Sequence, residues 1–195
     1  MTTPDLSNGY DAIAEEFIRG RGTNGDIGVS VVRQWAQELS AGAEVLDLGC
    51  GTGFPVSKIL FDQGLRIYAV DASPKMIAEF RRRFPNSLSE CNSVEASRFF
   101  DHTFDAVIAW GLVFLLQPGA QTALIQKVAR SLHRGGKFLF TSPQQAVEWP
   151  DSLTGQTSVS LGADLYRQVL DAQGLHVLGE GADEGDNYYY LAEKA

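Results

Sequence analysis

The sequence contains few of the residues that cross-link a small fold or bind metal. Its 195 residues include two cysteines and three histidines. Cys50 and Cys91 make neither a disulfide framework nor a four-ligand metal site, so we expect no metal and interpret both as packing residues. The alternative for Cys50 is a reactive thiol at a helix N-terminus, where the thiol pKa is lowered. The three histidines are expected to be structural or exposed rather than general bases.

Positive charge is also scarce. The chain has 16 Lys and Arg residues against 24 Asp and Glu residues, a formal net charge of −8. Affinity for nucleic acids comes largely from Lys and Arg side chains that neutralise phosphates, so we expect no nucleic-acid partner. The one basic cluster, Arg81–Arg83, is interpreted as the solvated end of a helix, and a clamp for a phosphate on a substrate is the alternative.

Long apolar stretches are absent too. Nowhere do 18 apolar residues follow one another, and residues 1–5 do not begin a signal peptide, so we expect no membrane partner and a cytoplasmic location. With 44% hydrophobic residues, a chain of this length buries enough apolar surface for one domain. The sequence leaves the oligomeric state open.

The most specific feature present is a glycine-rich turn. The apolar run Val45–Leu48 leads into glycines at positions 49, 51 and 53. Glycine has no Cβ, so backbone there can approach a ligand closely. A second apolar run, Ile67–Val70, ends in Asp71, whose carboxylate suits two ribose hydroxyls if the two strands are parallel neighbours. The pattern therefore predicts a nucleoside site.

A dinucleotide site is a rival interpretation of the same turn. Its Gly-x-Gly-x-x-Gly fingerprint, started at Gly49, requires glycine at position 54, which is Phe54. Started at Gly51, the fingerprint requires glycine at position 56, which is Val56. A side chain at that third place obstructs close packing of helix and strand, so the fingerprint fails in both registers.

Strands alternate with helices from position 43 onward, as in a doubly wound parallel sheet. The predicted strands lie at 43–49, 66–70, 87–91, 104–110 and 137–141. The predicted helices lie at 6–20, 27–40, 55–63, 74–83, 119–133 and 162–173. Residues 142–161 are expected to be a loop, and the apolar runs at 175–178 and 188–191 a hairpin around the turn 183–187.

The segment from Val45 to Pro55, together with Asp71, resembles the cofactor site of the class I S-adenosylmethionine-dependent methyltransferases. The resemblance covers the chain from about position 40. It implies an α/β fold: one Rossmann-like, doubly wound domain whose sheet has seven mostly parallel strands, an antiparallel last strand and helices on both faces. Residues 41–195 would form this core. Residues 1–40 would form a helical lid.

The resemblance also assigns binding roles for S-adenosylmethionine. Asp47 would help to hold the methionine amino group, Asp71 the ribose and Met76 one adenine face. The family usually has an acidic residue after the third strand, where this chain has Ser93. The full expected set is Tyr10, Arg19, Asp47, Gly49, Cys50, Gly51, Thr52, Gly53, Asp71, Ala72, Met76, Ser93, Val94, Glu95 and Trp110.

Catalytic residues cannot be assigned from the pattern. Methyl transfer from a sulfonium needs orientation more than acid-base groups. The candidates are Tyr10, Trp110 and Trp149. The expected acceptor pocket is small, with lining candidates Trp149, Glu148, Asp151, Tyr188 and Tyr190. The alternative role for the two tyrosines, and also for Met76 and Trp110, is packing in the core. The alternative for the lid is a solvated surface helix.

These observations predict a methyltransferase that acts on oxygen, nitrogen or sulfur of a small metabolite and releases S-adenosylhomocysteine. The segment after the fourth strand, Trp110–Val113, lacks the Asn-Pro-Pro-Tyr type of motif that is used for amino methylation of adenine or glutamine. Three alternatives stay open: a methyltransferase for protein or RNA, a module that binds the cofactor without catalysis, and a nicotinamide-dependent oxidoreductase.

Overall fold

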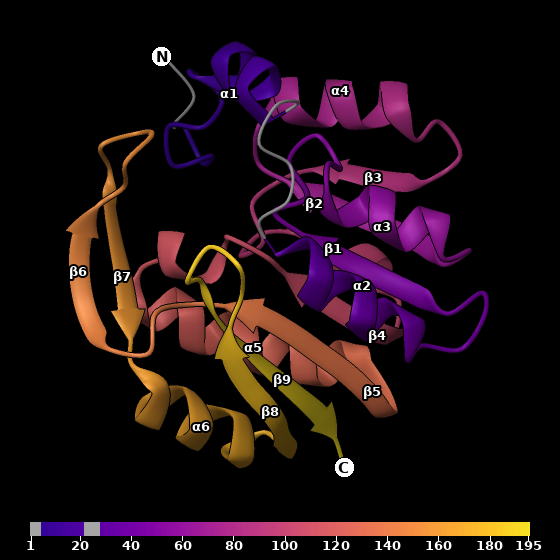
Figure 1. Ribbon diagram of the computed structural model, residues 1–195, viewed down its shortest axis with the longest axis vertical. Coiled ribbons are helices and arrows are strands. Elements are labelled where there is room, and N and C mark those ends of the chain that lie inside the picture. The colour runs from indigo at the N-terminus through magenta and orange to yellow at the C-terminus, as the bar shows by residue number, and fades with distance from the viewer. Residues whose placement is uncertain (1–4, 22–27) are drawn as a thin grey trace.

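The protein, described here by a computed structural model, is built on one seven-stranded sheet of order β3-β2-β1-β4-β5-β9-β8 (Figure 1). The structure describes residues 5–21 and 28–195. The strands of this sheet are β1 (Glu44–Leu48), β2 (Arg66–Asp71), β3 (Leu88–Cys91), β4 (Phe104–Ala109), β5 (Leu132–Thr141), β8 (Leu175–Ala182) and β9 (Tyr188–Lys194). The last strand, β9, pairs antiparallel with both β5 and β8, while the first five strands pair in parallel. The predicted fold class is confirmed.

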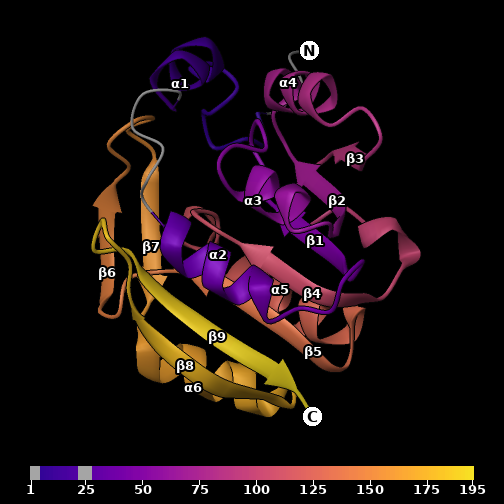
Figure 2. The same ribbon diagram turned by 45° about the vertical axis from the view of Figure 1, so that its right-hand side comes forward.

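Helices cover both faces of the sheet (Figure 2). The helical elements are α1 (Ala14–Arg21), α2 (Val29–Gln37), α3 (Val56–Asp62), α4 (Pro74–Arg83), η1 (Phe99–Asp101), η2 (Val113–Leu115), α5 (Pro118–Ser131) and α6 (Ala163–Ala172). Buried side chains of α2, α3 and α4 share one core cluster, which includes Trp35, Leu60 and Phe80. Those of α5 and α6, among them Ile125 and Tyr166, share the cluster on the other face. The two clusters hold the carboxyl ends of the parallel strands in one row.

Helix α4 shows how local sequence fixes the element that follows β2. Ser73 is its N-cap, and the Ser73 hydroxyl accepts a hydrogen bond from the Met76 amide at 3.2 Å. Pro74 is the first helical residue, where the missing N–H group costs nothing. Ile77 and Phe80 are fully buried against the sheet. The helix predicted at 74–83 is confirmed.

The N-terminal segment departs from the expected helix at 6–20. Residues 7–13 form turns, and α1 begins only at Ala14. The Asp5 carboxylate accepts hydrogen bonds from the amides of Ser7 and Gly9, and Asn8 and Gly9 have φ angles of 53° and 86°. An Asx turn followed by left-handed residues competes with helix, so the prediction was wrong for its first two turns.

The loop expected at 142–161 is also wrong. Strands β6 (Ala146–Pro150) and β7 (Thr157–Leu161) pair antiparallel and form a separate two-stranded sheet. The connecting turn is held by Asp151, whose Oδ1 accepts hydrogen bonds from the amides of Leu153 and Thr154. This hairpin stands away from the main sheet, and its tip lies near the N-terminal segment in both views (Figures 1 and 2). We refer to residues 146–161 as the β6–β7 hairpin.

Helix α2 belongs to the layer that packs on the sheet. Val32, Trp35 and Ala36 are buried in the same cluster as residues of β1 and α3. Its first turn is capped from a distance, because the Glu184 carboxylate accepts hydrogen bonds from the amides of Gly28 and Ser30. This packing places α2 with the core of the domain, whereas the lid expected for residues 1–40 stays a prediction.

Candidate active site

The glycine turn after β1 lies at the carboxyl ends of β1 and β2. The Gly49 amide donates a hydrogen bond to the Val70 carbonyl at 2.8 Å, which ties the turn to the end of β2. Gly49, Gly51 and Gly53 have φ angles of 68°, 54° and 80°, a region that L side chains rarely adopt. A Cβ on Gly51 would meet no atom within 4 Å, so that glycine faces open space.

Gly53 has a different role from Gly51. A Cβ there would lie 2.4 Å from the ring of Phe84 and 2.9 Å from the ring of Phe80. Gly53 therefore allows the turn to pack against the end of α4. Only Gly49 and Gly51 among the three glycines line the neighbouring cavity.

Asp71 is held at the rim of this cavity by backbone donors. One carboxylate oxygen accepts a hydrogen bond from the Gly51 amide, and the other accepts one from the Ser73 amide, both at 2.8 Å. Burial raises the pKa of Asp71, and these two hydrogen bonds oppose the rise. A carboxylate has about four lone-pair sites, so each oxygen retains capacity for one further donor.

The cavity in front of Asp71 has a volume of about 330 Å³. It collects most of the residues expected to bind the cofactor: Tyr10, Gly49, Gly51, Asp71, Ala72, Met76, Ser93, Val94, Glu95 and Trp110. The cavity lining does not include five others: Arg19, Asp47, Cys50, Thr52 and Gly53. Arg19 is exposed on α1, and Thr52 is buried.

Asp47 and Cys50 lie behind the turn rather than in the cavity. The Asp47 carboxylate is buried and accepts a hydrogen bond from the Ser57 hydroxyl at 2.5 Å. Burial raises the pKa of Asp47 to about 7. Burial likewise raises the pKa of the Cys50 thiol well above its usual value, with the nearby Asp71 charge adding to the effect. A thiol in that state is a poor nucleophile, which favours the packing role of Cys50.

The far side of the cavity is formed by Met76 and the turn at residues 93–97. Met76 is buried in the first turn of α4. The Ser93 hydroxyl accepts a hydrogen bond from the Ala96 amide at 3.2 Å, so it shapes the turn as a cap. Lys127 of α5 donates hydrogen bonds to the carbonyls of Val94 at 2.9 Å and Glu95 at 3.2 Å. Lys127 thus fixes this wall of the cavity. The sequence analysis did not identify Lys127.

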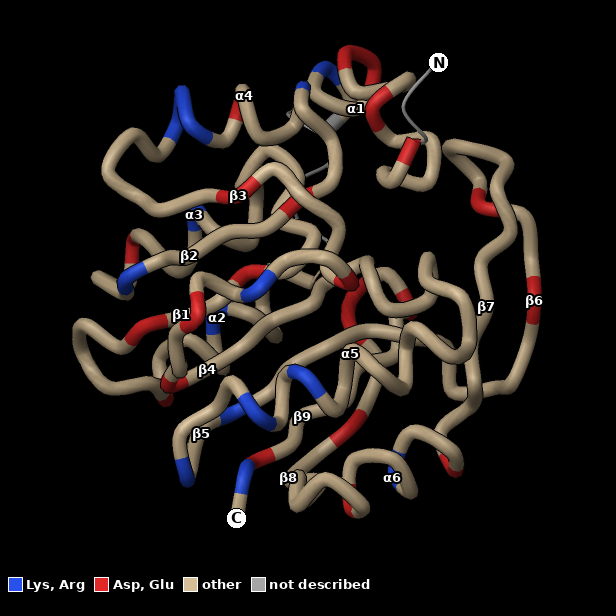
Figure 3. Tube along the Cα trace, turned by 180° about the vertical axis from the view of Figure 1, so that it is seen from behind, with Lys and Arg blue, Asp and Glu red and all other residues tan. Residues whose placement is uncertain are grey.

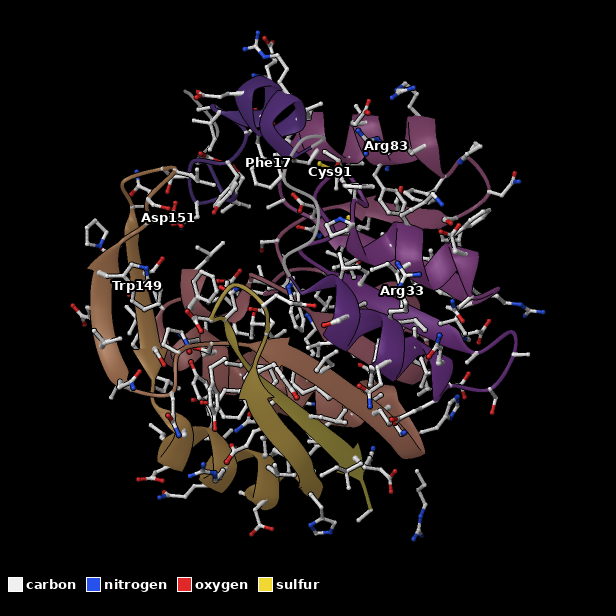
Figure 4. All side chains as sticks on the ribbon, viewed as in Figure 1. Phe17, Arg33, Arg83, Cys91, Trp149 and Asp151 are labelled. Atoms are coloured by element: carbon white, nitrogen blue, oxygen red, sulfur yellow. The ribbon has the colours of Figure 1, made fainter. Side chains whose placement is uncertain are left out.

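The N-terminal segment closes the cavity from above. Asp5, Leu6, Ser7, Asn8, Tyr10 and Phe17 contribute to its lining. The Asp11 carboxylate accepts hydrogen bonds from the Ser73 hydroxyl at 2.6 Å and from the Lys75 amide at 3.1 Å. The Tyr10 hydroxyl donates a hydrogen bond to Asp151 of the β6–β7 hairpin at 3.2 Å. Figure 4 shows Phe17 on α1 and Asp151 at the hairpin tip facing the same central space.

A second cavity, of about 570 Å³, adjoins the first. Tyr10, Phe17, Trp110 and Gly111 line both. A third, of about 480 Å³, continues outward along the hairpin and shares Phe114, Thr141, Ser152 and Asn187 with the second. We call these the first, second and third cavities.

Of the five residues expected to line the acceptor pocket, three line the third cavity and two do not. Trp149, Asp151 and Tyr188 line the third cavity. Tyr190 is fully buried in the core, stacked on Phe140, so it is a packing residue. Glu148 is exposed on β6. The candidate catalytic residues thus separate, with Tyr10 and Trp110 at the junction of the first two cavities and Trp149 farther out.

Several lining residues gave no recognisable signal in the sequence. Leu112, Leu115, Leu116 and Gln117 follow β4 and line the first cavity. Leu112 and Leu115 belong to an apolar stretch that does not distinguish lining from core. Lys127 stands in a helix whose other inward residues are apolar, and no short-range pattern links it to the turn at 93–97.

Two negative findings concern the described residues, 5–21 and 28–195. No cluster of three or more His, Cys, Asp or Glu side chains there is arranged to hold a metal ion. None of the helices in that part of the chain has both the length and the hydropathy of a membrane span.

Comparison with known proteins identifies the family. The family model for a methyltransferase domain matches residues 45–136, which hold the glycine turn, Asp71 and the turn at 93–97. The chain carries a domain of the class I S-adenosylmethionine-dependent methyltransferase family. A demethylmenaquinone methyltransferase from Beutenbergia cavernae is 32% identical over 152 residues, 73% of this chain and 60% of that protein. A cypemycin N-terminal methyltransferase from a Streptomyces species is 37% identical over 98 residues, 49% of this chain and 40% of that protein.

Solved structures show the same fold for the methyltransferase domain. A magnesium protoporphyrin IX methyltransferase from Synechocystis PCC 6803, with bound S-adenosylmethionine, superimposes with a TM-score of 0.75 at 18% identity over 100% of this chain and 99% of that chain. Among curated relatives, several are longer, and this chain spans about two-fifths of their length. A likeness at this level establishes the fold and leaves the substrate open.

Proposed function

We propose that the protein binds S-adenosylmethionine in the first cavity and transfers its methyl group to oxygen, nitrogen or sulfur of a small molecule in the second. The observation that carries this proposal is the Asp71 carboxylate. It is held at the cavity rim by the amides of Gly51 and Ser73 and retains an acceptor site on each oxygen. That geometry suits the two adjacent hydroxyls of a ribose.

The other walls fit the remaining parts of the same cofactor. Met76 offers a polarisable apolar face for the adenine, and the turn at 93–97 offers polar groups at its edge. The open space at Gly51 admits the nucleoside close to the backbone. Tyr10 and Trp110, which line both the first and the second cavity, mark the end at which the methyl group would be presented.

The chemistry follows from orientation. S-adenosylmethionine, when bound, would supply a methyl group activated by a positively charged sulfur, which would leave as a neutral thioether with the electron pair of the carbon–sulfur bond. Tyr10, Phe17 and Trp110 would keep water out and hold the acceptor in line. Holding reactants in this way supplies on the order of 7 to 11 kcal/mol in well-aligned systems. No acid-base pair is required when the acceptor is already a good nucleophile.

The relatives support a small-molecule acceptor. The demethylmenaquinone methyltransferase and a 1,6-didemethyltoxoflavin-N1-methyltransferase from Burkholderia thailandensis are named for compounds of this kind. The second of these superimposes with a TM-score of 0.68 at 18% identity. The net charge of −8 disfavours RNA as an acceptor, since phosphate binding depends on Lys and Arg.

The test is calorimetric titration with S-adenosylmethionine and S-adenosylhomocysteine. We expect both to bind, and Asp71→Ala to weaken binding by about 1.5 to 3 kcal/mol, the worth of hydrogen bonds to a charged group. Asp71→Asn keeps the side-chain volume and guards against a loss of folding. Asp62→Ala, at an exposed position on α3 that pairs with Lys58, is the control and should bind normally. Unchanged affinity in Asp71→Ala would refute the assignment, and binding without methylated products would favour a cofactor sensor.

A further inference from the structure

The second and third cavities form one continuous space between the N-terminal segment and the β6–β7 hairpin. Phe114, Thr141, Ser152 and Asn187 belong to the walls of both. The junction with the first cavity lies at Tyr10 and Trp110. An acceptor that reaches the methyl group would therefore contact the lining of this space.

Part of the lining is apolar and largely aromatic. Phe17, Trp110, Phe114 and Leu153 line the second cavity. The rings of Phe114 and Trp149 lie 5.5 Å apart between their centroids, so the aromatic surface continues into the third cavity. Flat apolar molecules pack well on such a surface, because rings stack in offset or tilted arrangements.

The charged groups along the space are acidic. Glu16 lines the second cavity, and Asp151 and Asp186 line the third. Lys and Arg are missing from the lining of all three cavities, as far as the side chains described by the structure extend. Figure 3 shows acidic positions on the β6–β7 hairpin, both acidic and basic positions on the N-terminal segment, and a basic stretch on α4.

The hydrogen bonds of Asp151 do not cancel its charge. Its Oδ1 accepts from the amides of Leu153 and Thr154 and from the Thr154 hydroxyl, and its Oδ2 accepts from the Tyr10 hydroxyl. All four donors are neutral. The negative field of the lining therefore persists, and it repels anions more strongly where the walls exclude water.

We propose, on the condition that the methyl transfer proposed above takes place, that the acceptor is an uncharged or cationic molecule with a flat apolar face. Molecules that carry a carboxylate or a phosphate are rejected. An anion entering this space would lose its hydration and meet carboxylates instead of a guanidinium or ammonium partner. The apolar lining residues take the flat face, and the acidic lining residues set the charge.

The experiment labels whatever the protein methylates. The full chain is incubated with methyl-tritiated S-adenosylmethionine and the low-molecular-weight fraction of a bacterial extract, and products are separated by anion exchange at neutral pH. A reaction without the protein sets the background. We expect most of the labelled product to pass through the anion exchanger. Labelled product held mainly on the exchanger would overturn the inference while leaving methyl transfer established.

Total absence of labelled product has a separate meaning. If the protein binds S-adenosylmethionine in the titration but labels nothing, the proposed transfer itself fails, and this inference fails with it. If the protein does not bind the cofactor, the failure lies one step earlier, at the first cavity. The three results are therefore distinguishable.

Ser152 offers a matched pair of variants that isolates charge. It is exposed and lines both the second and the third cavity. Ser152→Lys adds a positive charge at the shared wall, and Ser152→Gln adds an uncharged side chain of similar reach. We expect the lysine variant to raise the ratio of anionic to non-anionic labelled product severalfold over the glutamine variant. Equal ratios in the two variants would contradict an electrostatic basis for selection.

Discussion

The Asp11 carboxylate accepts a hydrogen bond of 2.6 Å from the Ser73 hydroxyl. The amide of the same Ser73 donates to Asp71, at 2.8 Å. One residue at the start of α4 thus links the N-terminal segment to the carboxylate that we assign to the ribose. The Asp11 charge also contributes to the raised pKa of Asp71, after burial. The position of the N-terminal segment over the first cavity and the protonation of Asp71 are therefore coupled.

Asp11→Ala should release the N-terminal segment from α4. It removes the acceptor for the Ser73 hydroxyl and the Lys75 amide, and at about 1 kcal/mol for each hydrogen bond we expect cofactor affinity to fall by about 1 to 2 kcal/mol. Calorimetry measures the affinity, and limited proteolysis reports exposure of residues 5–21. Glu15→Ala, an exposed acidic position on α1, is the control. A variant that binds as tightly as the unmodified protein would show that the segment does not contribute to closure.

Tyr10→Phe tests the contact between the N-terminal segment and the β6–β7 hairpin. The change removes the hydroxyl that donates to Asp151 at 3.2 Å and keeps the ring. We expect kcat/KM to fall by about fivefold, corresponding to about 1 kcal/mol. Asp151→Asn in the same background should then cost less than it does alone, because the two residues act as a pair. Fully additive losses would mean that the hydrogen bond does not matter for turnover. Tyr189→Phe is the control for loss of a tyrosine hydroxyl.

Asp47 should make stability depend on pH. Its pKa is about 7 in the folded protein against a usual value of 3.8, so the folded state holds its proton more tightly than the unfolded state does. The contribution of Asp47 to stability is therefore full below pH 4 and declines as the pH rises to 7, by up to about 1.4 kcal/mol per pH unit. Denaturant unfolding at pH 5, 6, 7 and 8 measures the slope. Asp47→Asn should flatten it, and an identical slope in that variant would contradict the assignment.

Gly53→Ala and Gly51→Ala should separate packing from ligand space. Both impose a left-handed conformation on alanine, at about 1 to 2 kcal/mol. The new methyl at Gly53 also lies 2.4 Å from the Phe84 ring, and overpacking adds about 1 to 3 kcal/mol. Thermal unfolding should thus show Gly53→Ala as the less stable variant. Titration should show the larger loss of cofactor affinity in Gly51→Ala, although that variant is the more stable of the two. A larger loss of affinity in Gly53→Ala would mean that Gly53, not Gly51, borders the ligand.

The proximity of the glycine turn and Asp71, which we assign to the cofactor, could be predicted because each part is local. The glycine turn and Asp71 each follow an apolar strand directly, and parallel neighbours place their carboxyl ends at one edge. Met76 follows within one turn of a helix that carries its own cap, Ser73. The antiparallel last strand was expected from the family resemblance rather than from periodicity, and the strand order is known only from the structure.

Three other features were missed in the sequence. One of them, the β6–β7 hairpin, could have been predicted from its local pattern. Val147 and Trp149 alternate with other residues before the Asp151 turn, and Val159 follows it, which is a readable hairpin pattern. The turns at 7–13 were misassigned because helical periodicity outweighed the Asx turn at Asp5. Lys127 gave no comparable signal, since its partners are carbonyl groups about 30 positions away.

The sequence by itself determined that the glycine turn and the Asp71 carboxylate, which we assign to a nucleoside, lie together, because each directly follows one of two adjacent strands. Only the tertiary structure decided which residues lie across the cavities from the glycine turn and Asp71. Tyr10 and Asp151 are 141 positions apart, and their hydrogen bond joins two surface segments that carry no shared period. The second and third cavities, which we propose for the acceptor, are lined by residues from these two segments and from the ends of β4, β5 and β8. The meeting of the two segments depends on long-range packing of the whole sheet, which no short stretch of sequence encodes.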